Sequence, residues 1–166
     1  TFIDIINDVD FNTERTKWQL KFAFVTTSAI MIGEFLHIPR AMWIGIACMS
    51  VFHPDKSQLQ IRYKQRMLYM VLGCLMYMSI YFLIPQQFRG LIGLIGGVMI
   101  GFSGTYKWQT VFNAFGALSA ATPILGFGGA IIFRILNNVF GALYSKGFDY
   151  IINFIDNKEF ANVNEA

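Results

Sequence analysis

The stretch Arg66-Met-Leu-Tyr-Met-Val-Leu-Gly-Cys-Leu75 is matched further along the chain by Arg134-Ile-Leu-Asn-Asn-Val-Phe-Gly-Ala-Leu143. Arg, Leu, Val, Gly and the final Leu are identical in the two stretches. From residue 66 to residue 134 the offset is 68 residues, and the same offset aligns Ile30-Met-Ile-Gly33 with Val98-Met-Ile-Gly101. Two blocks that share one offset predict an internal repeat.

The repeat predicts the architecture of the whole chain. Units of about residues 17–84 and 85–152 would each hold three apolar segments. An odd number of membrane crossings forces the second unit into the membrane upside down, and transporters built this way place their sites where the repeats meet. We therefore expect an all-α integral membrane fold with six transmembrane helices as a 3+3 inverted repeat.

Apolar runs separated by turn signals define the expected membrane domain, residues 17–147. Its six segments are expected at residues 18–38, 41–53, 67–85, 90–105, 108–125 and 130–147. The second is shorter than the roughly 20 residues that a membrane crossing needs, so it would be tilted or shielded. Pro123 is expected to break the fifth, and Gly126, Gly128 and Gly129 are expected to mark the turn that follows it. Short amphipathic helices are expected at both ends, a lead-in over 1–16 and a cytoplasmic tail over 148–166.

Composition supports membrane insertion. Of 166 residues, 55% are apolar and only 14% are charged, against about 25% charged residues in soluble domains. Lipid is thus an expected partner and nucleic acid is not. No cofactor, no metal site and no enzymatic function are expected, because phosphate loops, metal-ligand spacings and catalytic triads are absent from the sequence. The chain begins with Thr1, so we expect it to be part of a longer polypeptide.

The distribution of Lys and Arg predicts the orientation. With the N-terminus inside, ten of the thirteen Lys and Arg residues lie on the cytoplasmic side. Arg40 and Arg89 would face outward, and Arg134 falls inside the sixth segment. Positively charged loops stay on the cytoplasmic side. We therefore expect both termini in the cytoplasm and place the chain in the bacterial inner membrane.

Arg134 is the main candidate for substrate binding. A charge at membrane depth is costly and usually faces a cavity or a partner, and the planar guanidinium group suits carboxylates. The functional interpretation is an anion contact, assisted by Arg66 or Arg40. The structural alternatives are an ion pair with Glu34 or extension of the side chain toward the membrane surface. For Arg66, cytoplasmic anchoring is the alternative.

Three further residues carry weaker hypotheses. Glu34 could take part in proton coupling or neutralise Arg134 or Arg40. His37 could titrate near neutral pH, although a single His at a helix end is more often an ordinary interface residue. Trp43 is consistent with a membrane-interface aromatic residue and also with stacking on an aromatic substrate.

Glycines are expected to pack helices closely, because small residues let helix backbones approach each other. The fourth segment carries two G-x-x-x-G spacings, and the repeated stretches carry one Gly each. The candidates are Gly93, Gly97, Gly101, Gly73 and Gly141. Packing within one subunit is the first interpretation, and a dimer face or a backbone-lined pore is the alternative.

The sequence resembles the membrane domain of the fusaric-acid-resistance-like proteins, the aromatic acid exporter superfamily. The resemblance runs from about Lys17 to Tyr144 and includes Ile38-Pro-Arg-Ala-Met-Trp43. The family motif R-x-x-G-T-x-x-G is matched by Arg66 and Gly73, and R-x-x-D/N-T-x-x-G by Arg134, Asn137 and Gly141. Tyr69 and Met70 replace the Gly-Thr pair of the first motif, and Asn138 replaces the Thr of the second.

The resemblance implies a six-span unit that exports aromatic carboxylic acids or related organic anions, with a dimer or a second membrane unit of the same polypeptide as partner. Three hypotheses follow. The first is an exporter of organic anions, the second an anion channel on the same scaffold, and the third a membrane anchor or assembly module for further cytoplasmic domains.

Overall fold

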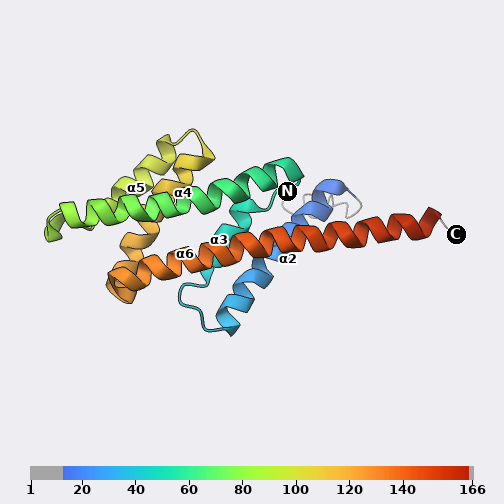
Figure 1. Cartoon of the computed structure of the whole chain (residues 1–166), viewed down its shortest axis with the longest axis horizontal. Helices are drawn as coiled ribbons and strands as arrows, with labels where there is room; N and C mark the ends of the chain where they lie inside the picture. The colour runs from blue at the N-terminus through green and yellow to red at the C-terminus, as the bar shows by residue number, and fades with distance from the viewer. Residues whose placement is uncertain (1–12, 165–166) are drawn as a thin grey trace, which may run out of the picture.

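The computed structural model describes residues 13–164, with side chains described as far as Phe154. This part of the chain is helical and contains no strand (Figure 1). Five α-helices and one short 3-10 helix follow one another: α2 (Glu14–Phe35), α3 (Met42–Val51), α4 (Lys56–Leu83), η1 (Gln86–Phe88), α5 (Leu91–Phe102) and α6 (Tyr106–Asn164). The all-helical class expected from the sequence is confirmed.

The longest helix, α6, consists of two arms. Gly126 adopts φ 71° and ψ 164°, which is not helical, and separates a first arm (106–125) from a second arm (127–164). The two arms run in different directions in Figure 1. The break expected at Pro123 is wrong, because α6 continues through this proline and turns three residues later. Only glycine adopts the backbone conformation of Gly126 readily, so the turn forms there.

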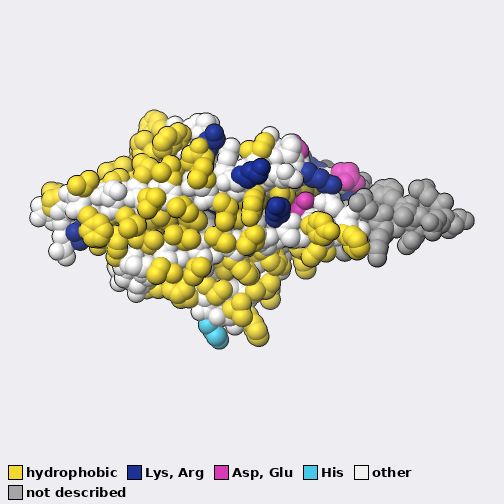
Figure 2. Space-filling view, viewed as in Figure 1, with side chains coloured by type: hydrophobic (Ala, Val, Ile, Leu, Met, Phe, Trp, Pro, Cys, Tyr) yellow, Lys and Arg dark blue, Asp and Glu magenta, His cyan; other side chains and the backbone are white. Residues whose placement is uncertain are grey.

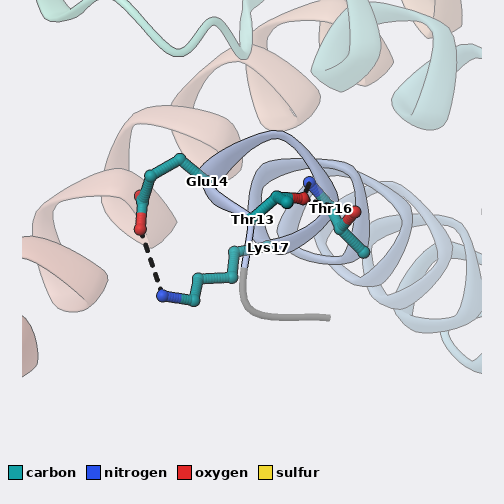
Figure 3. Close-up of polar contacts among 4 residues, drawn as sticks. All are labelled: Thr13, Glu14, Thr16 and Lys17. Carbon is teal, nitrogen blue, oxygen red and sulfur yellow. Dashed lines mark hydrogen bonds and ion pairs between the residues drawn. The ribbon is translucent and has the colours of Figure 1, made fainter. Parts of the chain in front are cut away.

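Local signals explain where the helices begin. The Thr13 hydroxyl accepts a hydrogen bond from the Thr16 backbone N–H at 3.3 Å and caps α2 (Figure 3). The Asp55 carboxylate accepts from the Ser57 backbone N–H at 2.8 Å and caps α4. Such caps satisfy backbone donors that lack a partner in the first helical turn. Helix α4 therefore begins at Lys56, and residues 56–66, which lie between two of the expected apolar segments, are helical.

The predicted terminal elements are described only in part. Of the amphipathic lead-in expected over 1–16, residues 1–12 lie outside the described residues. At the other end, α6 continues without a break from the sixth expected segment through the tail region as far as Asn164.

Large apolar side chains cover the outside of the molecule (Figure 2). Phe35, Leu83 and Phe102 are 83%, 82% and 81% exposed. Two helices, α4 and the part of α6 up to Phe154, are long and apolar enough to cross a membrane, and only 28% and 22% of their most apolar windows are buried. A core helix of a soluble protein would be mostly buried. Exposed apolar surface of this extent, on helices of spanning length, indicates a membrane protein.

The buried apolar residues form two clusters. One cluster joins α4 and α5 to the first arm of α6, around Tyr77 and Phe115. The other joins α2 and α3 to the second arm, with Ile44 and Ala142 among its members. Each cluster thus combines two helices from one half of the sequence with a long helix from the other half. Helix α6 contacts α2, α3, α4 and α5, which makes it the central element.

Candidate anion site

Two arginines from the repeated stretches lie buried inside the helix bundle. Arg66 of α4 is 2% exposed and Arg134 of the second arm of α6 is 1% exposed. The two arginines belong to one hydrogen-bonded network that runs through Asn138. The sequence placed Arg66 at the cytoplasmic surface as one alternative; the structure places it in the interior, next to its repeat counterpart.

Asn138 connects the two arginines. Its Oδ1 accepts hydrogen bonds from Arg66 Nε at 3.0 Å and from Arg66 Nη2 at 2.7 Å. Its Nδ2 donates to the Arg134 carbonyl oxygen at 2.7 Å, one helical turn earlier in α6. An amide oxygen can accept both bonds because it carries two lone pairs. Arg66 is therefore held by a neutral amide and not by a carboxylate.

Arg134 is only partly satisfied by its neighbours. Its Nη2 donates to Asn113 Oδ1 in the first arm of α6 at 3.1 Å. Its guanidinium carbon lies 5.0 Å from the centre of the Trp43 ring, in cation–π geometry. Nε and Nη1 are buried and have no hydrogen-bond partner within the described structure. Three of the five N–H groups of an arginine lie on these two nitrogens, so most of its donor capacity is unused.

The turn before α3 positions Trp43 against Arg134. His37 and Arg40 adopt left-handed backbone conformations, with φ 53° and 59°. The Asn137 amide donates to the carbonyl oxygens of Pro39 at 2.9 Å and Arg40 at 3.1 Å. Asn137 is adjacent to Asn138 and belongs to the same helix as Arg134. The second arm of α6 therefore supplies both the arginine and the amide that fixes the aromatic ring beside it.

No acidic side chain pairs with an arginine of this cluster in the described part of the chain. Glu34 is exposed, and among the described residues the one ion pair is the surface contact between Lys17 and Glu14 at 3.1 Å (Figure 3). The pair between Glu34 and Arg134, which the sequence left open, is therefore not formed. His37 is exposed as well, so neither predicted proton-coupling residue contacts the arginines. No group of three or more metal-binding side chains occurs in the described part of the chain.

Arg40 contributes to the cluster through its backbone. Its carbonyl oxygen binds Asn137, as described above, while its Nη2 donates to the Ala120 carbonyl oxygen in the first arm of α6 at 3.4 Å. The structure thus brings together Arg134, Arg66 and Trp43, with Arg40 at the adjoining turn.

Glycines allow the long helices to approach their neighbours closely. A Cβ atom added at Gly73 would lie 2.8 Å from the Val111 carbonyl oxygen, and one at Gly141 would collide with the Ile44 carbonyl oxygen. A Cβ at Gly93 would lie 2.8 Å from the Ser119 side chain. At Gly97 and Gly101 an added Cβ meets nothing within 4 Å, so these two glycines make no close helix contact within the described chain.

Sequence reasoning missed Asn113 and did not assign the two adjacent amides a role. Asn137 and Asn138 interrupt an apolar run three and four residues after Arg134. Side chains at these spacings lie on the same helix face, and polar groups inside membrane helices usually face a partner. That signal was available in the sequence. For Asn113, nothing in the sequence indicated which helix it would face.

A family model described as fusaric acid resistance protein-like matches residues 28–145. The match includes every residue of the arginine cluster and extends from the middle of α2 into the second arm of α6. No curated protein and no solved structure matches the chain. The matched region covers well over half of the sequence, and the family has a membrane transport or resistance role that is not enzymatic. The chain therefore belongs to the fusaric acid resistance protein-like family of membrane proteins.

Proposed function

We propose that this chain is a transport domain that exports organic anions, aromatic carboxylates in particular, through the site formed by Arg134 and Arg66. The observation that carries the proposal is a pair of buried guanidinium groups with no carboxylate partner in the described structure. Removing the partner of a buried charge typically costs about 3–5 kcal/mol. An anion that binds between these arginines would compensate for this cost.

The surroundings of Arg134 favour an aromatic carboxylate. Nε and Nη1 are free to donate hydrogen bonds, and hydrogen bonds between arginine and carboxylate are short and strong. The guanidinium group lies over the Trp43 ring, so an aromatic acid bound at the guanidinium edge would lie next to the edge of the indole. Since stacked or edge-to-face aromatic pairs add about 0.5–1.5 kcal/mol, such a site would bind an aromatic acid more tightly than an aliphatic one of the same charge.

The inverted repeat is part of this proposal. Gly73 of the first unit packs α4 against Val111 and Ala114 of the second unit. Its counterpart at the 68-residue offset, Gly141, packs the second arm of α6 against Ile44 and Ala47 of the first unit. These reciprocal contacts support a two-fold relation between the units. The site would then lie at the contact between the repeats, as in transporters of this architecture.

We further propose that both termini are cytoplasmic in a bacterial inner membrane. The start of α2 and the end of α6 lie toward the same end of the molecule (Figure 1), and most charged side chains visible in Figure 2 gather over that part. This distribution supports the orientation that the positive-inside rule favours. The proposal gives Glu34 and His37 no role in proton coupling, because both are exposed and distant from the arginines.

The test is transport by the purified full chain in liposomes that contain benzoate on one side, with benzoate flux and current recorded together. We expect Arg134→Gln to lower benzoate flux by about tenfold or more, because one charged hydrogen bond contributes about 1.5–3 kcal/mol. Arg62→Gln is the matched control. Its guanidinium group also stacks on an aromatic ring, that of Tyr106 at 5.5 Å. Tyr106 lies beside Arg66 as well, but Arg62 itself makes no hydrogen bond to Arg66, Arg134 or Asn138 in the described structure.

The outcomes separate the three hypotheses. Flux lost in Arg134→Gln and kept in Arg62→Gln supports the proposed site, and a sustained conductance with the same dependence would identify a channel on this scaffold. Equal flux in Arg134→Gln and the wild type would contradict the proposal. Lack of flux in correctly folded wild-type protein would favour the anchor hypothesis.

A further inference from the structure

A polar cavity lies near the kink of α6, away from the arginine pair. It has a volume of ≈ 200 Å³ and is formed by the end of α4, the segment that includes η1, and the last turns of the first arm of α6. The residues that line it include Tyr77, Tyr81, Arg89, Ser119 and Thr122. None of these residues belongs to the cluster around Arg134.

Two hydrogen-bond donors in this cavity have no partner. Arg89 Nε and Ser119 Oγ are both buried atoms without a hydrogen bond in the described structure. Leaving such a group unsatisfied costs about 1–3 kcal/mol, and more for a charged group. The two atoms come from different elements, the segment before α5 and the first arm of α6. A ligand that accepts hydrogen bonds from both would offset the two costs at once.

The cavity wall favours an anion. The cavity is lined by one cation, Arg89, and by no acidic residue. The guanidinium carbon of Arg89 lies 4.2 Å from the centre of the Tyr81 ring. This stacking fixes the guanidinium plane, and its N–H edge remains available to donate hydrogen bonds to a ligand. Fixed planar guanidinium groups bind carboxylates well.

The hydroxyl group of Tyr77 is already hydrogen-bonded, so Tyr77 presents only its uncharged ring to a ligand. Thr122 Oγ1 donates its only hydrogen to the Leu118 carbonyl oxygen at 2.7 Å. The Tyr77 hydroxyl group, 3.3 Å from Thr122 Oγ1, must therefore be the donor of that second bond. The hydroxyl hydrogen of Tyr77 is therefore already used. Arg89 and Ser119 are the groups left to donate hydrogen bonds to an anion, and the Tyr77 and Tyr81 rings face the apolar part of that anion.

The size of the cavity limits the ligand. A volume of ≈ 200 Å³ equals about seven water molecules at liquid density, which leaves room for one ring and one carboxylate group. Along α4, Tyr77 follows Arg66 by eleven residues, or about 16 Å at the helical rise of about 1.5 Å per residue. The cavity is therefore a separate location from the buried arginine pair.

We propose that this cavity is a second anion-binding site, which holds the carboxylate of a single-ring aromatic acid between Arg89 and Ser119 with the ring against Tyr77 and Tyr81. In the orientation proposed above, it lies toward the outer surface and would receive the anion after the Arg134 site. The position in the export path rests on the proposed function, whereas binding at Arg89 does not.

The experiment is a ¹⁹F NMR titration of the purified full chain with 4-fluorobenzoate, which counts sites and measures their affinities without transport. We expect two sites in the wild type and one in Arg89→Gln, with the affinity of the lost site reduced by about tenfold or more. Arg62→Gln, whose guanidinium group also stacks on a tyrosine ring, should keep both sites. Ser119→Ala, which removes one neutral donor, should weaken the same site by about threefold to tenfold and provides the test if Arg89→Gln does not fold.

Several results would overturn the proposal. Unchanged binding in Arg89→Gln would do so, and so would equal losses in Arg89→Gln and Arg62→Gln, which would indicate a general charge effect. A single wild-type site that disappears only in Arg134→Gln would refute the second site and leave the proposed function standing. Inorganic phosphate, acetate and 4-fluorobenzamide should compete at least tenfold more weakly than benzoate; equal competition would refute the assignment to an aromatic carboxylate.

Discussion

Asn138 determines how two like charges are held next to each other in the bundle. Asn138 accepts two bonds from Arg66 through one oxygen and donates to the Arg134 backbone through its nitrogen. An acidic residue at this position would neutralise Arg66 by itself. An amide satisfies the donors of Arg66 and leaves the positive charge of the site intact, which is what a site for a diffusible anion requires.

Replacing Asn138 by leucine tests this role. We expect Asn138→Leu to destabilise the protein by about 1–3 kcal/mol, because Arg66 Nε and Nη2 would be left buried without an acceptor. Asn153→Leu is the matched control, since Asn153 also donates to a carbonyl oxygen one turn earlier in α6, at 2.6 Å, without holding an arginine. Thermal unfolding of both variants in the same detergent measures the difference. Equal unfolding temperatures would show that Arg66 does not depend on Asn138.

A single residue could be assigned to the candidate site from the sequence where its residue type is energetically unfavourable in its surroundings. Arg134 was identified because a charge within an apolar segment has few explanations. Arg89 was not identified, because it lies between segments, where a cation is ordinary. Its importance depends on Ser119 and Tyr81, which are remote from each other in sequence and meet only in the folded structure.

Gly126 shows at the scale of helices how a glycine, and not a proline, divides α6. Pro123 has no backbone N–H and is tolerated within the first arm, whereas Gly126 adopts φ 71° and ψ 164°. Residues other than glycine pay about 1–3 kcal/mol for such a conformation. The sequence predicted a break at Pro123 and a turn marked by Gly126, Gly128 and Gly129. The break at the proline is wrong, whereas the turn forms at the first of these glycines.

The kink of α6 leads to a prediction that compares substitutions of Gly126 and Pro123. Gly126→Ala should lower the free energy of unfolding by about 1–3 kcal/mol, because alanine is strained at this φ and ψ. Steric crowding does not contribute, since a Cβ atom at Gly126 would have no neighbour within 4 Å. Pro123→Ala should leave stability unchanged or raise it, because alanine favours a helix interior where proline does not. A denaturant titration of each variant decides, and a larger loss in Pro123→Ala would contradict this account of the turn.

At the scale of the whole molecule, the two halves exchange their long helices. Helix α4 of the first half packs on the first arm of α6, and the second arm packs on α3. The two arginines come from these exchanged helices, so neither half contains the site alone. The sequence repeat predicted two related units, but it could not predict the exchange, because the match at a fixed offset describes each unit by itself and not the contacts between units.

The exchanged arrangement leads to a test of topology in which two loops must lie on the outer side of the membrane and a third must lie on the cytoplasmic side. Cys48 and Cys74 are free and buried, so an impermeant thiol reagent should react mainly with introduced cysteines. His37, Gln87 and Thr105 are exposed residues in the turns before α3, before α5 and before α6. In an inverted repeat with a cytoplasmic N-terminus, His37→Cys and Gln87→Cys should be labelled from outside intact cells. Thr105→Cys should be labelled only after permeabilisation.

The wild type, with no introduced cysteine, provides the background of this labelling. Labelling of Thr105→Cys from outside together with His37→Cys would show that α3, α4 and α5 together cross the membrane an even number of times, and the inverted repeat would then be wrong. Labelling of Thr105→Cys alone from outside would keep the alternation and reverse the orientation. In that case the cavity around Arg89 would open toward the cytoplasm, and the order in which an exported anion meets its two sites would be reversed.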